Sequence, residues 1–191
     1  MQWYEMTHLH WHRLFQEVFP EVPWGHWLVI GIFSLALTGL LRAFTRQSAR
    51  GYICLGITIL VGLFLLDTAV VIRWGDGVAR SAKFDLVKEY HQLINGNAAR
   101  WTEMLANVAV FVPFGFFLSE FLSTTRRYSA WCQIGRVALA ALGLSLCIES
   151  LQLIFRLGVF EITDLVLNTL GGFVGALISV GVRKVVGERN Y

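Results

Sequence analysis

Long charge-poor stretches alternate with short polar segments along the chain, and this pattern predicts helices that cross a membrane. A spanning helix needs about 20 predominantly apolar residues, at a rise of about 1.5 Å each. Five stretches meet this requirement: residues 22–41, 51–72, 104–125, 137–155 and 164–182. We therefore predict an all-α polytopic membrane protein in which residues 22–191 form a single transmembrane domain.

Two further segments have one apolar helical face but are too polar to span. The arm of residues 1–21 places five apolar side chains on one face: Trp11, Leu14, Phe15, Val18 and Phe19. The loop of residues 73–103 repeats the pattern at Phe84, Val87, His91 and Ile94. Both segments are expected to form interfacial helices that lie along the membrane surface.

The composition agrees with a membrane environment. Of the 191 residues, 55% are hydrophobic and only 15% are charged, whereas soluble domains average roughly 45–50% and 25%. The net charge of +3 is too small to favour nucleic acid as a partner. Membrane lipids are therefore the expected partners.

Basic residues collect on one side of the predicted bundle. The two short loops and the tail carry three each: Arg42, Arg46 and Arg50, then Arg126, Arg127 and Arg136, then Arg183, Lys184 and Arg189. Because Lys and Arg near short loops mark the cytoplasmic side, we predict a cytoplasmic C-terminus and an N-terminus outside.

Polar side chains within the last three spans gather near one end of the predicted bundle. Successive spans alternate in direction, so the starts of the third and fifth spans and the end of the fourth share one face, which is the outer face by the charge argument. The residues there are Asn107 in the third span, Glu149, Gln152 and Arg156 on one stripe of the fourth, and Asp164 and Asn168 on one stripe of the fifth. We predict a polar pocket there, closed by the loop of residues 156–163.

The first interpretation of this cluster is structural. An acid in a spanning helix costs at least about 2.5 kcal/mol, so Glu149 must face protein or water. Glu149 would then pair with Arg156, Arg100 or another basic residue, while Asp164 would cap the fifth helix and the amides would join neighbouring helices.

The second interpretation is a functional site. Glu149 would act as general acid or base with Asp164 as an ionised partner, which makes these two the candidate catalytic residues. The candidate substrate-binding residues are Asn107, Gln152, Asn168, Arg156 and Arg100. His8 and His12 lack a third metal ligand of equal quality and no cofactor motif is present, so we predict no metal and no cofactor. The same pocket could instead bind a ligand without changing it.

Small residues indicate how the helices around such a pocket pack. Gly171 and Gly175, with Gly172 beside them, have the GxxxG spacing that lets another helix approach closely. Pro113 and Gly115 should loosen the third span within two turns of Asn107.

Three strings in the C-terminal half resemble the VanZ-like family of bacterial membrane proteins. They are NVAVFVPFGFFL at residues 107–118, IESLQ at 148–152 and FEITDLVLNTLGGFVGA at 160–176. The resemblance covers a core of residues 104–180 and carries over the positions Asn107, Pro113, Gly115, Glu149, Gln152, Asp164, Asn168 and Gly171.

The resemblance implies a multi-pass protein of the bacterial cytoplasmic membrane with a role in the cell envelope. The founding member of the family is linked to resistance to the lipoglycopeptide-like antibiotic teicoplanin. Three functions stay open from the sequence: an enzyme for an envelope lipid or lipid-linked glycan, a protein that binds or shields such a lipid or a lipoglycopeptide, and a structural membrane subunit.

Overall fold

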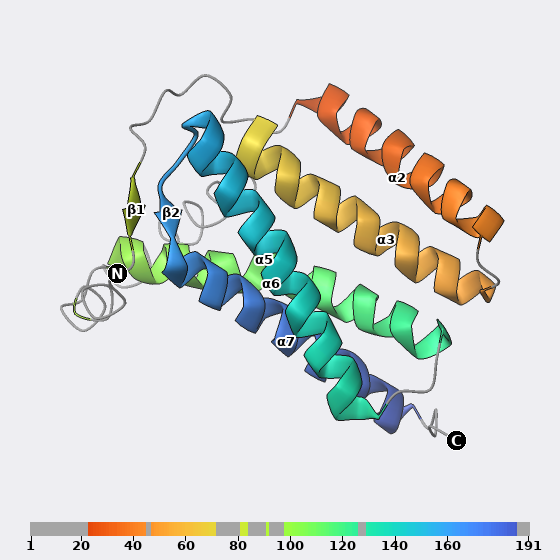
Figure 1. Cartoon of the computed structure of the whole chain (residues 1–191). Helices are drawn as coiled ribbons and strands as arrows, with labels where there is room; N and C mark the ends of the chain where they lie inside the picture. Colours follow the sequence, from red (N-terminus) through yellow and green to blue (C-terminus); the bar gives the residue numbers. More distant parts are fainter. Residues whose placement is uncertain are drawn as a thin grey trace, which may run out of the picture.

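The computed structural model describes residues 23–44, 47–71, 81–83, 91, 98–125 and 129–186. The predicted interfacial arm lies outside these residues, as does nearly all of the predicted interfacial helix in the long loop, so both stay predictions. The described elements are α2 (Trp24–Phe44), α3 (Ala49–Leu66), the π-helical turn η1 (Asp67–Val71), β1 (Ala82–Lys83), α5 (Ala98–Thr125), α6 (Ala130–Phe155), β2 (Phe160–Glu161) and α7 (Ile162–Val185) (Figure 1).

Five of the described helices are long and apolar enough to cross a membrane, which confirms the predicted fold class. Their ends differ from the predicted spans mainly in the third and fourth. Helix α5 begins at Ala98, within the segment that we assigned to the loop, and α6 begins at Ala130. Ser129 caps α6 by accepting a hydrogen bond from the N–H of Cys132 at 3.3 Å, so the helix starts two turns before its apolar run.

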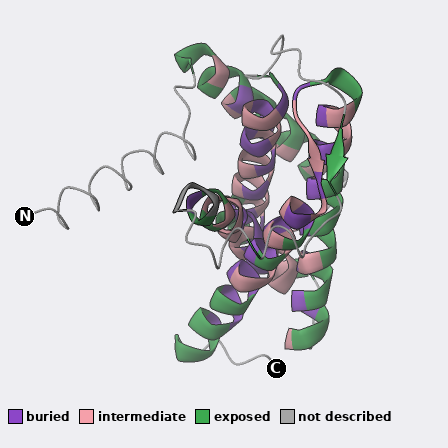
Figure 2. Cartoon of the chain, turned by 90° about the vertical axis from the view of Figure 1, so that its left-hand side faces the viewer, coloured by how far each residue is buried: buried purple, intermediate pink, exposed green. Residues whose placement is uncertain are grey.

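The exposed surface of the bundle is apolar. Trp24, Leu28 and Leu35 of α2 are all more than two-thirds exposed, as expected for side chains that face lipid. Figure 2 shows exposed residues on the outward faces of the helices and buried residues toward the inside. The buried centre is formed by Phe111, Val137, Ala141 and Ala176.

Helix α2 lies at the edge of the bundle and packs on α3 (Figure 1). Trp27 stacks on Phe64 with ring centroids 4.9 Å apart, and the Ser34 hydroxyl donates to the carbonyl of Gly56 at 2.8 Å. These contacts join the two helices near the middle and at one end.

The bundle has two polar ends. At the strand end, α3 and α6 finish, α5 and α7 begin, and β1 pairs with β2 (left in Figure 1). At the opposite end, which we call the arginine end, α5 and α7 finish and α3 and α6 begin. The two ends are where the candidate sites lie.

Two short strands at the strand end were not predicted. Strands β1 and β2 are parallel, with Ala82 opposite Phe160 and Lys83 opposite Glu161. The Lys83 ammonium donates to Glu161 Oε1 at 2.7 Å. This pairing fixes part of the long loop against the short connection between α6 and α7.

Candidate functional site

The glycines of α7 set the distance between the two helices that carry the site. A Cβ atom at Gly171 would lie 2.8 Å from Phe111 Cβ, and one at Gly175 would lie 2.7 Å from the backbone nitrogen of Phe116. A Cβ at Gly115 would lie 2.7 Å from the Cα of Gly172. Real Cβ atoms do not approach other atoms so closely, so only glycine allows this contact. The predicted close approach of another helix to α7 is confirmed, and that helix is α5.

This close approach brings Asn107 of α5 against Asp164 in the first turn of α7. The Asn107 amide donates to Asp164 Oδ1 at 2.7 Å, and both residues are only half-buried. Helix α5 continues as an α-helix through Pro113, which cannot donate a hydrogen bond to the carbonyl four residues earlier.

Glu149 lies deeper, near the end of α6. It is 3% exposed, and its Oε2 accepts the backbone N–H of Glu161 at 3.1 Å. The connection between α6 and α7 therefore folds back over this carboxylate. Arg156 ends α6 in the left-handed conformation at φ 60°, and its side chain is exposed and makes no ion pair with Glu149. The Arg100 side chain lies outside the described part of the structure.

Two of the predicted substrate-binding amides hold helices together. The Gln152 amide donates to the carbonyl of Ala69 in η1 at 3.1 Å, and the Asn168 amide donates to the Ser145 hydroxyl at 2.9 Å. Asn168 Oδ1 is buried and has no hydrogen-bond partner. These contacts favour the structural interpretation for Gln152 and Asn168.

A further pair at the strand end was missed by the sequence reasoning. His26 Nδ1 lies 2.9 Å from each carboxylate oxygen of Asp67, which joins α2 to η1. Asp67 is the single charged residue within the predicted second span, and nothing in the pattern indicates His26 as its partner. Among the described residues, no three His, Cys, Asp or Glu side chains are grouped to hold a metal ion.

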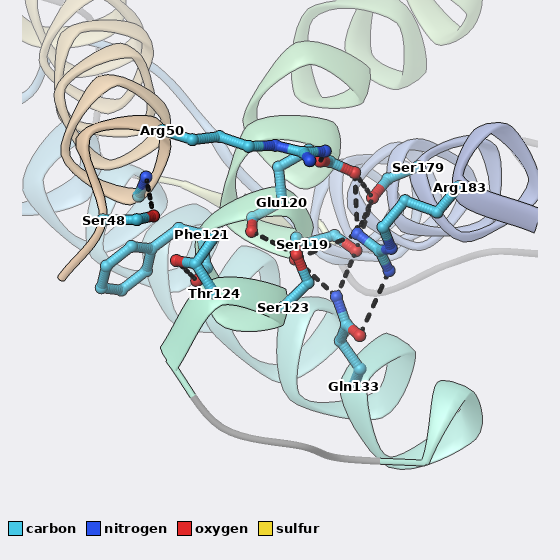
Figure 3. Close-up of polar contacts among 11 residues, drawn as sticks. Ser48, Arg50, Ser119, Glu120, Phe121, Ser123, Thr124, Gln133, Ser179 and Arg183 are labelled. Carbon is cyan, nitrogen blue, oxygen red and sulfur yellow. Dashed lines mark hydrogen bonds and ion pairs between the residues drawn. The ribbon is translucent and has the colours of Figure 1, made fainter. Parts of the chain in front are cut away.

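A second polar cluster occupies the arginine end (Figure 3). Its members come from four helices: Arg50 of α3, Ser119 and Glu120 of α5, Gln133 of α6, and Ser179 and Arg183 of α7. Glu120 is at its centre and pairs with both Arg50 and Arg183. The sequence showed Glu120 as a charge within an apolar span, but Arg50 and Arg183 were considered only as loop and tail charges.

The sequence profile of the VanZ/LLP1 family matches residues 52–183. The chain belongs to the VanZ/LLP1 family. The match runs from the first turn of α3 almost to the end of α7 and includes most of both polar ends, so it extends further toward the N-terminus than the predicted core. It leaves out α2 with His26, and it leaves out Arg50.

One relative of the chain is Protein VanZ from Enterococcus faecium. It is 40% identical over 75 residues, which are 38% of this chain and 41% of that protein. The matched segment thus spans less than half of that protein's length. No solved structure matches the chain.

Proposed function

We propose that this VanZ/LLP1 family protein binds an amphiphilic, glycan-bearing ligand at its strand end without changing it chemically. The ligand class is a lipid-linked glycan or a teicoplanin-type lipoglycopeptide, and binding of the antibiotic lowers the amount that reaches its target in the cell envelope. The observation that carries this proposal is the half-buried Asn107–Asp164 pair.

The burial of Glu149, the candidate general acid or base, favours binding over catalysis. A general acid or base must come within about 2.6–3.2 Å of the substrate atom, directly or through one water. Glu149 is 3% exposed and accepts a backbone hydrogen bond, which leaves it covered. Asp164 is more accessible, and with Asn107 it offers the amide and carboxylate groups that bond to glycan hydroxyls and peptide N–H groups.

Exposed apolar side chains on the same two helices as the pair suit the fatty chain of such a ligand. Trp101 and Leu105 precede Asn107 on α5 and are 49% and 55% exposed. Val166 and Leu170 follow Asp164 on α7 and are 52% and 45% exposed. A ligand with a polar head at the pair could therefore keep its acyl chain in the bilayer beside these helices.

We also propose that the strand end faces outward from the bacterial cytoplasmic membrane. Of the seven basic residues whose side chains the structure describes, five lie at the arginine end: Arg42, Arg50, Arg136, Arg183 and Lys184. Of the six described acids, five lie at the strand end: Asp67, Glu103, Glu149, Glu161 and Asp164. Basic residues near helix ends favour the cytoplasmic side, and the ligand would then approach from the outer leaflet.

The experiment compares protection of a susceptible bacterium against teicoplanin and against the same glycopeptide without its fatty acyl chain. Wild-type protein should raise the inhibitory concentration of the acylated compound only. Asp164→Asn keeps the hydrogen bond from Asn107 but removes the charge, and a hydrogen bond to a charged group contributes about 1.5–3 kcal/mol. Binding should weaken roughly 10- to 150-fold, and protection should be lost at an unchanged protein level.

Glu103→Gln is the matched control, because Glu103 is an exposed acid on α5 at the same end, and it should leave protection unchanged. Unchanged protection by Asp164→Asn, or equal protection against both compounds, would contradict the proposal. Mass spectrometry of recovered antibiotic separates the enzymatic alternative, since a chemically altered compound requires catalysis.

A further inference from the structure

The cluster at the arginine end is one connected hydrogen-bond network. Glu120 Oε1 accepts from Arg183 Nη1 and from the Ser179 hydroxyl, both at 2.7 Å, while Glu120 Oε2 accepts from Arg50. Gln133 Oε1 accepts from Arg183 Nη2 at 3.2 Å, and the Gln133 amide donates to the Ser119 hydroxyl at 2.8 Å. Figure 3 shows these side chains pointing toward one another from four helices.

The network contains two guanidinium groups and one carboxylate. Its central side chains are buried, with Glu120 and Arg183 only 5% and 4% exposed. Of the acids that the structure describes, Glu120 alone lies at this end. Glu120 and Arg183 form the buried part of the network, and the second guanidinium, that of Arg50, lies nearer the surface, where its positive charge attracts an anion.

One donor of the network is also unsatisfied. Arg183 Nε is buried and has no hydrogen-bond partner, although both Nη atoms of the same guanidinium are bonded. Arg50 differs, because its side chain is 48% exposed while Glu120 Oε2 holds its Nη2 atom in place. Glu120 thus holds the Arg50 guanidinium at the surface of the bundle. The same carboxylate binds the buried Arg183 guanidinium on its other oxygen.

Arg50 also lies in the first turn of α3, which Ser48 caps by accepting the Gly51 N–H at 3.1 Å. The start of a helix carries a partial positive charge that adds to the attraction of an anion. The Arg fork matches phosphate oxygens in geometry and charge. Because α3 is long and apolar enough to span a membrane, we expect the start of the helix at the level of the lipid headgroups.

We propose that the cluster binds the phosphate group of an anionic phospholipid from the leaflet at the arginine end. Arg50 contacts the phosphate directly, Glu120 orients Arg50, and Arg183 supplies the second positive charge from behind. The inference is independent of the site around Asn107 and Asp164, which lies at the other end of the same helices. Soluble phosphate shares this chemistry, so the test distinguishes the two sources.

The test uses the full-length protein in nanodiscs of phosphatidylcholine with a minor fraction of phosphatidylglycerol. Co-purified lipid is measured by mass spectrometry after extraction into detergent, and thermal unfolding in detergent is followed with added phosphatidylglycerol or inorganic phosphate. Wild-type protein should retain phosphatidylglycerol in excess of its share in the nanodisc. Phosphatidylglycerol should also raise its unfolding temperature, whereas inorganic phosphate at equal concentration should not.

Arg50→Gln is the decisive variant because Arg50 is partly exposed and its loss leaves the buried Glu120–Arg183 pair intact. One basic residue at a membrane surface changes lipid affinity about fivefold, so retention of phosphatidylglycerol should fall by about that factor. Arg136→Gln removes an exposed arginine of α6 at the same end and should change retention little. An equal fall in both variants would show only general surface charge and would overturn the proposal, and equal stabilisation by inorganic phosphate would overturn the lipid as its source.

Discussion

Replacing Gly175 by Ala should separate α5 from α7 and destabilise the whole bundle. The added methyl group would lie 2.7 Å from the backbone nitrogen of Phe116 and in contact with the carbonyl of Val112. Neither neighbour is a side chain that can rotate away, so the two helix backbones must move apart. Overpacking of a close contact costs about 1–3 kcal/mol, and the rigid neighbours place this variant in the upper part of that range.

Gly181→Ala is the matched control on the same helix. Among the described residues, and apart from the neighbouring backbone of α7 itself, no atom lies within 4 Å of a Cβ built at Gly181, so the substitution adds no clash there. Any gain in helix propensity from Gly to Ala, about 0.5–1 kcal/mol, occurs in both variants and cancels in their difference. We therefore expect the two variants to differ by about 2–3 kcal/mol, or roughly 30- to 150-fold in the unfolding equilibrium.

The assay is unfolding of the purified protein in mixed micelles of a mild detergent and sodium dodecyl sulfate, followed by circular dichroism. The midpoint for Gly175→Ala should move to a lower fraction of dodecyl sulfate, while the midpoint for Gly181→Ala stays at or above that of the wild type. Equal midpoints for the two variants would refute this reasoning, because they would mean that α5 and α7 can move apart without lowering the free energy of unfolding.

Three further predictions concern charge and topology. Glu149→Gln should leave protection against teicoplanin largely intact, since the amide oxygen can still accept the Glu161 N–H; complete loss of protection in a stable variant, measured by inhibitory concentration, would instead favour catalysis. Glu120→Gln should lower the free energy of unfolding by about 3–5 kcal/mol because Arg183 is then left buried without its carboxylate. Thermal unfolding should show that adding Arg183→Met partly restores the unfolding temperature. An unfolding temperature that is not restored would argue against the ion pair as the cause. In a variant without native cysteines, Ser81→Cys should react with an impermeant thiol reagent in intact cells and Ser48→Cys should not, since the two positions are at opposite ends of the bundle; the reverse pattern would invert the proposed orientation.

The spans and the glycine contact could be predicted because each depends on a local pattern. A run of about 20 apolar residues is sufficient to indicate a spanning helix, and the four-residue spacing of Gly171 and Gly175 places both on one helical face. The polar residues of the strand end could also be assigned to one face, because alternating spans fix which helix ends lie together. Helix ends were less accurate, since hydropathy detects the charge-free stretch and not a capped turn such as the one at Ser129.

The pairings within each end could not be predicted. Asn107 and Asp164 are 57 residues apart, and the sequence carries no signal for which polar groups at one face bond directly. Arg50 and Arg183 flank apolar stretches, where a basic residue usually lies in water at the membrane surface, so the pattern gave no sign that the helices turn Arg183 inward to Glu120. Strands of two residues, such as β1 and β2, are too short to show the alternation that marks a strand.

The pairing of β1 with β2 also constrains how the protein is assembled. The chain is made from its N-terminus, and two complete spans, α5 and α6, separate Lys83 from Glu161. The hydrogen bond from the Phe160 N–H to the Ser81 carbonyl can therefore form only after both spans have been inserted. If only one of the two spans crossed the membrane, the two strands would lie on opposite sides of it and could not meet. The strand pair thus forms late in biogenesis, after α5 and α6 have both been inserted and cross the membrane in opposite directions.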